Sequence, residues 1–140
     1  MVSKKDVPAG NGRSRLAKET TTSAAESAQP FSTGSIVLAT LREPREKFWG
    51  ALLALDPAGV SLQGIELSSF DDATSAFVGG GPLITAVLFF PMHRVERIAM
   101  DLPEGNLPSL SQRFQSRTGM NPREALARSA DNAAGGRAGA

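Results

Sequence analysis

Apolar residues are concentrated in the middle of the chain, between Ser35 and Leu102, and both flanking regions are largely polar. Inside this block, short runs of β-prone residues alternate with turn-forming residues, a pattern typical of strands. It predicts five strands, at Ser35–Leu41, Phe48–Leu55, Val60–Glu66, Leu83–Phe90 and Val95–Leu102. So few short strands bury a common core best by curling around it. We therefore expect a mainly β fold, a small five-stranded barrel that is closed or half-closed.

The segments between the strands carry clear turn chemistry. The charged run Arg42–Lys47 contains Pro44, which cannot donate to a strand ladder, and this predicts a hairpin tip. Asp56–Gly59 has proline at the second and glycine at the fourth position of a tight turn. The strand between these two turns is apolar on both faces, so we expect it to lie centrally, with Gly50 permitting a sharp bend.

Three short helices are predicted in addition to the strands. Ser69 is a candidate N-cap for a helix that the glycines 79–81 terminate. Ser109 and Gln112 have the spacing of a capping box, and Asn121-Pro122 has the residues that begin a last helix. The C-terminal helices are expected either to dock on the strands or to contact a partner.

These patterns divide the chain into four segments. Residues 1–34 form a polar leader with few large apolar side chains, which cannot offset its ordering entropy, so we expect disorder there. Residues 35–102 form the small β-barrel, and residues 103–128 form a helical C-terminal extension. The Gly/Ala-rich residues 129–140 are expected to be a second disordered tail.

Composition removes several classes of function. The 140 residues contain no cysteine, which excludes disulfides, thiolate nucleophiles and zinc–thiolate sites and fits a cytoplasmic location. With one histidine, no tyrosine and no serine motif beside a recognisable base, we expect no enzyme, no metal and no cofactor. The longest apolar stretch, Ala86–Met92, has seven residues, so no membrane partner is expected. No apolar region follows Lys4 and Lys5, as a secretory signal would require.

Charge is distributed unevenly along the chain. The net charge is +2 over residues 1–34, −3 over residues 35–102 and +2 over residues 103–140. A dedicated nucleic-acid domain usually carries a strongly basic face, which the acidic middle block does not indicate in bulk. The charge balance therefore favours a protein-interaction adaptor, while the basic tails keep RNA as a candidate partner.

Three segments of the block resemble the Sm-like fold, a strongly bent five-stranded sheet whose bacterial version is an RNA chaperone. Ile36–Leu38 followed by Phe48–Leu52 resembles the first two strands of that family. Leu55–Leu62 resembles its second turn and third strand, and His93–Ile98 is similar to the segment around its uracil-pocket histidine. The resemblance implies RNA as a ligand. SH3-like barrels have the same strand count and bend, so both folds remain open.

The candidate RNA site consists of one histidine and two nearby arginines: His93, Arg94 and Arg97. An imidazole can stack on a base, and guanidinium groups can pair with phosphates. The alternative interpretation is a turn histidine held by backbone groups beside solvated strand-end charges.

A second candidate surface is the hairpin tip with Arg42, Arg45 and Lys47. These residues either dock a protein partner or form a solvated loop that protects a sheet edge from aggregation. The neighbouring Trp49 is expected to be a core residue. The strand Leu83–Phe90 is unusually apolar for a possible edge, so self-association into a homo-oligomer is also expected.

Overall fold

The computed structural model describes residues 29–139, with side-chain surroundings for residues 29–132. The chain divides into two units, Met1–Pro30 and Phe31–Ala140, and every element given below belongs to the second. Residues 1–28 of the predicted leader lie outside the described residues. The Gly34 N–H donates a hydrogen bond of 2.7 Å to the Leu52 carbonyl, so the residues just before the first strand are joined to the sheet.

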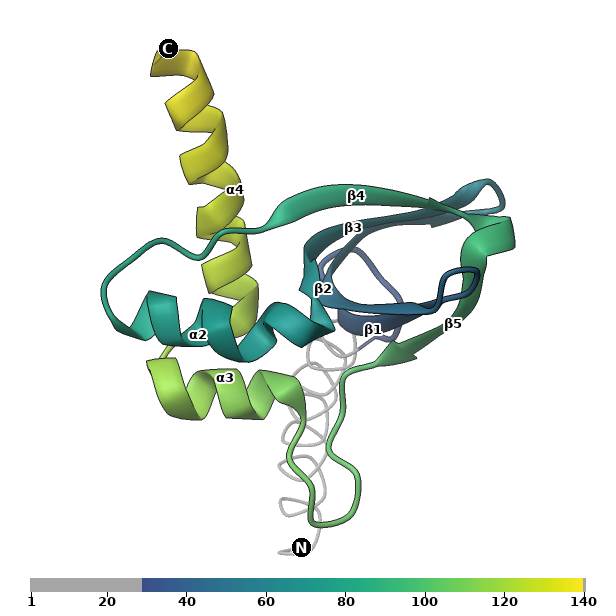
Figure 1. Ribbon diagram of the computed structural model, residues 1–140, viewed down its shortest axis with the longest axis horizontal. Coiled ribbons are helices and arrows are strands. Elements are labelled where there is room, and N and C mark those ends of the chain that lie inside the picture. Colours follow the sequence, from purple (N-terminus) through teal and green to yellow (C-terminus); the bar gives the residue numbers. More distant parts are fainter. Residues whose placement is uncertain (1–28, 140) are drawn as a thin grey trace, which may run out of the picture. The chain divides into compact units, whose positions relative to one another are not determined.

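The second unit is built on one five-stranded antiparallel sheet. Its strands are β1 (Ile36–Leu41), β2 (Glu46–Asp56), β3 (Gly59–Glu66), β4 (Ala86–Pro91) and β5 (Val95–Met100). Neighbouring strands follow the order β4-β3-β2-β1-β5 (Figure 1). This confirms the predicted mainly β fold with five strands. The sheet is not closed into a barrel, because β4 and β5 are its two edges and do not pair with each other.

The fourth strand begins at Ala86 and not at the predicted Leu83. Ala86 lies opposite Gly64, which is the last residue of β3 to pair with β4. Leu83 leaves the sheet and is buried in the cluster that packs against the helices. A continuous apolar run does not by itself distinguish a strand from a buried connection, which is why the prediction began too early.

Two glycines allow β2 and β3 to approach each other closely. Gly50 and Gly64 lie opposite each other in the register of these strands. A Cβ atom on Gly50 would collide with the backbone of Gln63, and one on Gly64 would collide with the backbone of Trp49. The sequence predicts that Gly50 permits a sharp bend; what requires glycine here is the close approach of the two strands, since only glycine fits between them.

The helical elements are η1 (Leu67–Ser69), α2 (Phe70–Val78), η2 (Met92–Arg94), α3 (Leu110–Thr118) and α4 (Pro122–Gly139). The predicted capping box of α3 is confirmed, with reciprocal bonds of 3.0 and 2.9 Å between Ser109 and Gln112. Gly119 ends this helix with φ of 75°. Ser69 occupies the N-cap position of α2, but its side chain forms no capping hydrogen bond.

Helix α4 continues through residues 129–139, where the Gly/Ala composition predicts a tail without structure. Alanine has the highest intrinsic helix propensity, and the first turn of α4 is set by Asn121, whose side chain accepts from the Arg123 N–H at 2.9 Å. Over residues 29–139, no helix combines the length and the apolarity needed to cross a membrane.

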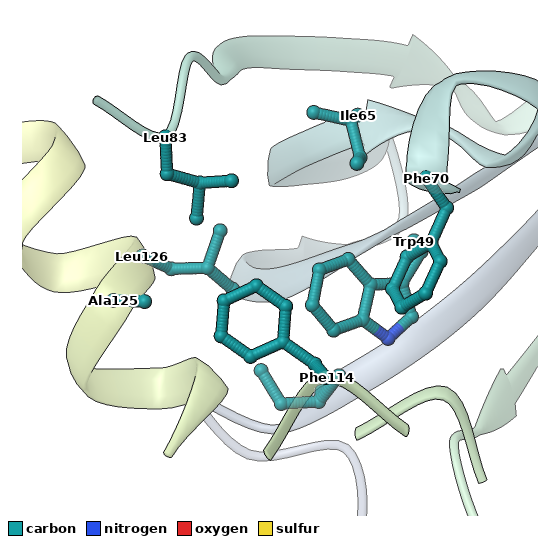
Figure 2. Close-up of a cluster of buried hydrophobic side chains, with 8 residues drawn as sticks. Trp49, Ile65, Phe70, Leu83, Phe114, Ala125 and Leu126 are labelled. Atoms are coloured by element: carbon teal, nitrogen blue, oxygen red, sulfur yellow. The ribbon is translucent and has the colours of Figure 1, made fainter. Parts of the chain in front are cut away.

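One face of the sheet packs against the helices (Figure 2). Trp49 is fully buried at the centre of this cluster, which confirms its predicted place in the core. Its ring lies 5.0 Å from the Phe70 ring of α2, edge to face, and 5.8 Å from the Phe114 ring of α3. Leu126 of α4 belongs to the same cluster. The C-terminal helices therefore dock on the sheet through their apolar residues.

The other face of the sheet buries a second cluster within its own curvature. Its buried residues are Val37, Ala39, Leu41, Leu62 and Phe90. Phe90 comes from the edge strand β4, and residues of the opposite edge strand β5 pack against the same cluster. The sheet thus curls enough for both edges to share a core, although they form no ladder with each other.

Candidate functional site

The sequence predicted two candidate surfaces, and the fold joins them at one end of the sheet. The β1–β2 turn lies against η2 and the start of β5. Arg42 donates from its backbone N–H to the Arg94 carbonyl at 2.9 Å and from Nε to the His93 carbonyl at 3.1 Å. In Figure 1 this region lies at the end of the sheet away from the helices. We call it the cationic end, made of Arg42, Arg45, Lys47, His93, Arg94 and Arg97.

Arg94 holds the β1–β2 turn in place through two contacts of its guanidinium group. Its guanidinium forms a 2.8 Å ion pair with Glu46 and donates to the Pro44 carbonyl at 3.3 Å. The Arg94 side chain is only 27% exposed, and its Nε is buried without a hydrogen-bond partner among the described residues. One terminal nitrogen of Arg94 therefore holds the turn through both Glu46 and Pro44.

Arg45 contributes less to holding the fold together. It lies 3.9 Å from Glu96, and both side chains are well exposed. An exposed pair at this distance contributes little to stability, because solvent and salt screen it. Arg45 therefore keeps its charge available to a ligand, in competition with one nearby carboxylate.

Among the described residues, Lys47 and Arg97 are the two cations of this end whose side chains form neither an ion pair nor a hydrogen bond. Both lie directly opposite Thr40, Lys47 on β2 and Arg97 on β5. Residues that face each other across an antiparallel ladder lie on one face of the sheet. Two strand spacings place their backbones about 10 Å apart. Both side chains are exposed, and neither forms an ion pair within the described part of the chain.

The fold also separates charges that are mixed along the sequence. All five basic residues of segment 35–102 lie at the cationic end, together with the acidic residues Glu43, Glu46 and Glu96. Four of the remaining carboxylates lie toward the helices, at Glu66, Asp71, Asp72 and Asp101. Asp56 lies at the β2–β3 turn beside η2, where the Ala58 carbonyl accepts from the Met92 N–H at 3.0 Å. A segment with a net charge of −3 therefore has a local excess of one positive charge at this end.

His93 lies in η2 and is exposed. Its carbonyl accepts the bond from Arg42, which fixes the backbone of the turn and leaves the imidazole at the surface. Within residues 29–139, no group of three His, Asp or Glu side chains is placed to hold a metal ion. The geometry suits contact with a flat or anionic ligand at the surface.

Sequence reasoning missed the main buried polar residue, Asp101, which follows β5. Its carboxylate accepts from the Trp49 indole N–H at 3.0 Å and from the backbone N–H groups of Leu110 and Ser111 at 3.0 and 2.7 Å. It also accepts from the Ser111 hydroxyl at 2.7 Å. A carboxylate at the first turn of a helix is stabilised by the helix dipole. Asp101 therefore ties β2, β5 and α3 together.

A second polar group missed from the sequence links α4 to the sheet. Gln63, which is buried on β3, donates to the Leu126 carbonyl at 3.0 Å and to the Thr85 hydroxyl at 3.3 Å. Thr85 in turn contacts the hydroxyl of Ser129 at 2.8 Å. No local sequence signal marks either network, because each joins residues far apart in the chain.

Comparisons with protein-family models, with curated proteins and with solved structures found no match to this chain.

Proposed function

We propose that this protein is a non-catalytic binding module with an Sm-like small β fold, and that it binds single-stranded RNA through the cationic end. The observation that carries the proposal is the gathering of all five basic residues of segment 35–102, with the single histidine, at one end of the sheet. The five antiparallel strands and their curl support the Sm-like assignment. An SH3-like fold is the alternative that has the same strand count.

The residues of the cationic end have different roles in this proposal. Lys47 and Arg97 pair with phosphates, since they are exposed and free of ion pairs within the described residues. Their spacing of about 10 Å along the sheet suits contacts with separate phosphates of one strand. His93 stacks on a base, which single-stranded RNA presents and a duplex does not. Arg94 holds the turn on which the other groups depend.

The test is a titration of a labelled single-stranded RNA with the full chain at several salt concentrations. Replacing Lys47 and Arg97 together with alanine should weaken binding roughly tenfold at low salt. The slope of log K against log salt should become shallower by about 1.4, since each lost phosphate contact on a single strand contributes about 0.7. Changing His93→Ala should alter the preference between oligouridylate and oligoadenylate more than the slope.

The matched control removes the same charge from a different surface. Arg123 and Arg128 are exposed residues of α4, so the double change of Arg123 and Arg128 to alanine lowers the net charge by two without touching the cationic end. It should leave both affinity and salt slope nearly unchanged. No RNA binding by the full chain at low salt, or equal losses in both double variants, would refute the proposed site.

A protein-interaction adaptor is the second candidate function. The observation that favours it is the alternation of charge at the cationic end, where Arg94 pairs with Glu46 and Arg45 lies near Glu96. Such a mixed surface suits a protein partner with complementary charges. The contact would involve Arg42, Arg45 and Lys47, because the apolar residues of the C-terminal helices are already packed on the sheet. A chain that does not bind RNA would favour this function.

A further inference from the structure

The free edge of β4 lacks the charges that usually protect an edge strand. Within the described residues 29–139, β4 pairs only with β3, so its other side carries no strand of this part of the chain. No Asp, Glu, Lys or Arg occurs from residue 79 to residue 93. Val87 is 68% exposed and Phe89 is 55% exposed. Monomeric proteins commonly place charged residues on such edges, because open backbone groups beside apolar side chains attract another strand.

The backbone of β4 presents its open hydrogen-bonding groups at these same two residues. The Met92 N–H donates to the Ala58 carbonyl at 3.0 Å, on the side of β3. In an antiparallel ladder, the backbone N–H and C=O groups of every second residue point to the same side of the strand. The backbone groups of Phe90 and Leu88 therefore also point toward β3. The N–H and C=O groups of Val87 and Phe89 then face the open side.

A hollow lies beside this edge on the opposite face of β4. It has a volume of about 470 Å³ and is lined mainly by apolar residues, among them Phe48, Ile65, Ala73, Ile84 and Leu88. A strand added to β4 would bring its own side chains to the mouth of this hollow, because facing residues of paired strands share a face.

We propose that two copies of this chain pair through β4, antiparallel and about a two-fold axis near Leu88. In this register Val87 of each copy faces Phe89 of the other, so the open N–H and C=O groups of both strands meet. The uncharged edge is complementary to itself and brings no like charges together. The opposite edge is a poorer partner, since β5 exposes Glu96 and Arg97. The inference uses no residue of the cationic end and stands apart from RNA binding.

The experiment measures the mass of the full chain by sedimentation over a wide range of concentrations. We expect a reversible dimer. Val87→Lys should raise the dimer dissociation constant at least about tenfold, because it places two ammonium groups in an apolar interface. The matched control is Val78→Lys on α2, where the valine is 55% exposed, and it should leave the dimer intact.

A backbone substitution tests the strand pairing itself. Val87→Pro removes one N–H that faces the open side, and proline is tolerated on the free side of an edge strand. It should abolish the dimer while circular dichroism retains the spectrum of the wild type. If the proline variant fails to fold, the lysine variant still decides.

Three results would overturn the proposal: a dimer unaffected by Val87→Lys, an assembly larger than two chains, and a monomer at every concentration. A larger assembly would indicate that β4 of one copy pairs with β5 of the next. A monomer would indicate that the edge of β4 binds an extended segment of another protein instead of a second copy.

Discussion

The part of the sheet that packs against α2, α3 and α4, which we call the helix-covered end, and the cationic end use polar side chains in opposite ways. At the helix-covered end, Asp101 is only 8% exposed and accepts four hydrogen bonds from three residues. At the cationic end, Lys47 and Arg97 are exposed and form no ion pair among the described residues. A buried polar group must be satisfied within the protein, whereas an exposed one can be satisfied by a ligand. The same strand, β5, joins the two ends.

This difference indicates that substitutions at the helix-covered end should mainly change stability, and that substitutions at the cationic end should mainly change binding.

The largest change in stability is expected from Trp49→Ala. Trp49 is fully buried, so the variant should lose about 3–5 kcal/mol of unfolding free energy in a denaturant titration, as buried large aromatics do. Leu55→Ala, at a position 45% exposed, is the control and should change stability by less than about 1 kcal/mol. Equal effects of the two variants would contradict the core position of Trp49.

The next largest effect is expected from Asp101→Ala. The change leaves the Trp49 indole N–H and two backbone N–H groups of α3 without their acceptor, which should cost about 3 kcal/mol. Asp72→Ala provides a control, since Asp72 lies in the first turn of α2 and is exposed, whereas Asp101 is buried against the first turn of α3; about 0.5 kcal/mol is expected for the control. Chemical denaturation of both variants separates the two cases. A loss for Asp101→Ala no greater than the control would show that the hydrogen bonds of its carboxylate contribute nothing net.

The smallest effect on stability is expected from substitutions within the cationic end, and it separates the residues that hold the fold from those that bind a ligand. Arg94 belongs to the cationic end but is bound within the protein, so Arg94→Ala should cost about 1 kcal/mol of stability. Its effect on RNA affinity should be smaller than that of the Lys47 and Arg97 double change. Arg45→Ala, whose pair with Glu96 is longer and exposed, should leave stability within about 0.5 kcal/mol of the wild type. A larger loss of RNA affinity from Arg94→Ala than from the double change would make Arg94 a direct ligand.

Local sequence signals were sufficient for most of the elements. Alternating apolar residues gave five strands, and the capping box of Ser109 and Gln112 marked the start of α3 correctly. They were insufficient where one signal fits two structures. Leu83 looked like a strand residue because it is apolar, but it packs against the helices.

The candidate site was predictable in its residues and not in its assembly. The sequence singled out His93, Arg94 and Arg97 in one segment, and the Arg42–Lys47 tip as a separate surface. Only the antiparallel register places Lys47 and Arg97 on either side of Thr40. The bulk charge of segment 35–102 argued against a cationic surface, because a sum over residues contains no information on where each charge lies.

The sequence by itself determined the strand number, the turns, the helix caps and the residue types available for binding, because these depend on local periodicity and on short-range hydrogen bonding. The tertiary structure decided which groups are buried and which meet. It brought the Asp101 carboxylate to the Trp49 indole N–H and paired Arg94 with Glu46 across the β1–β2 turn. It also left the apolar edge of β4 without a partner strand among the described residues. The first two outcomes depend on contacts between residues 52 and 48 positions apart, and no local pattern in the chain encodes such contacts.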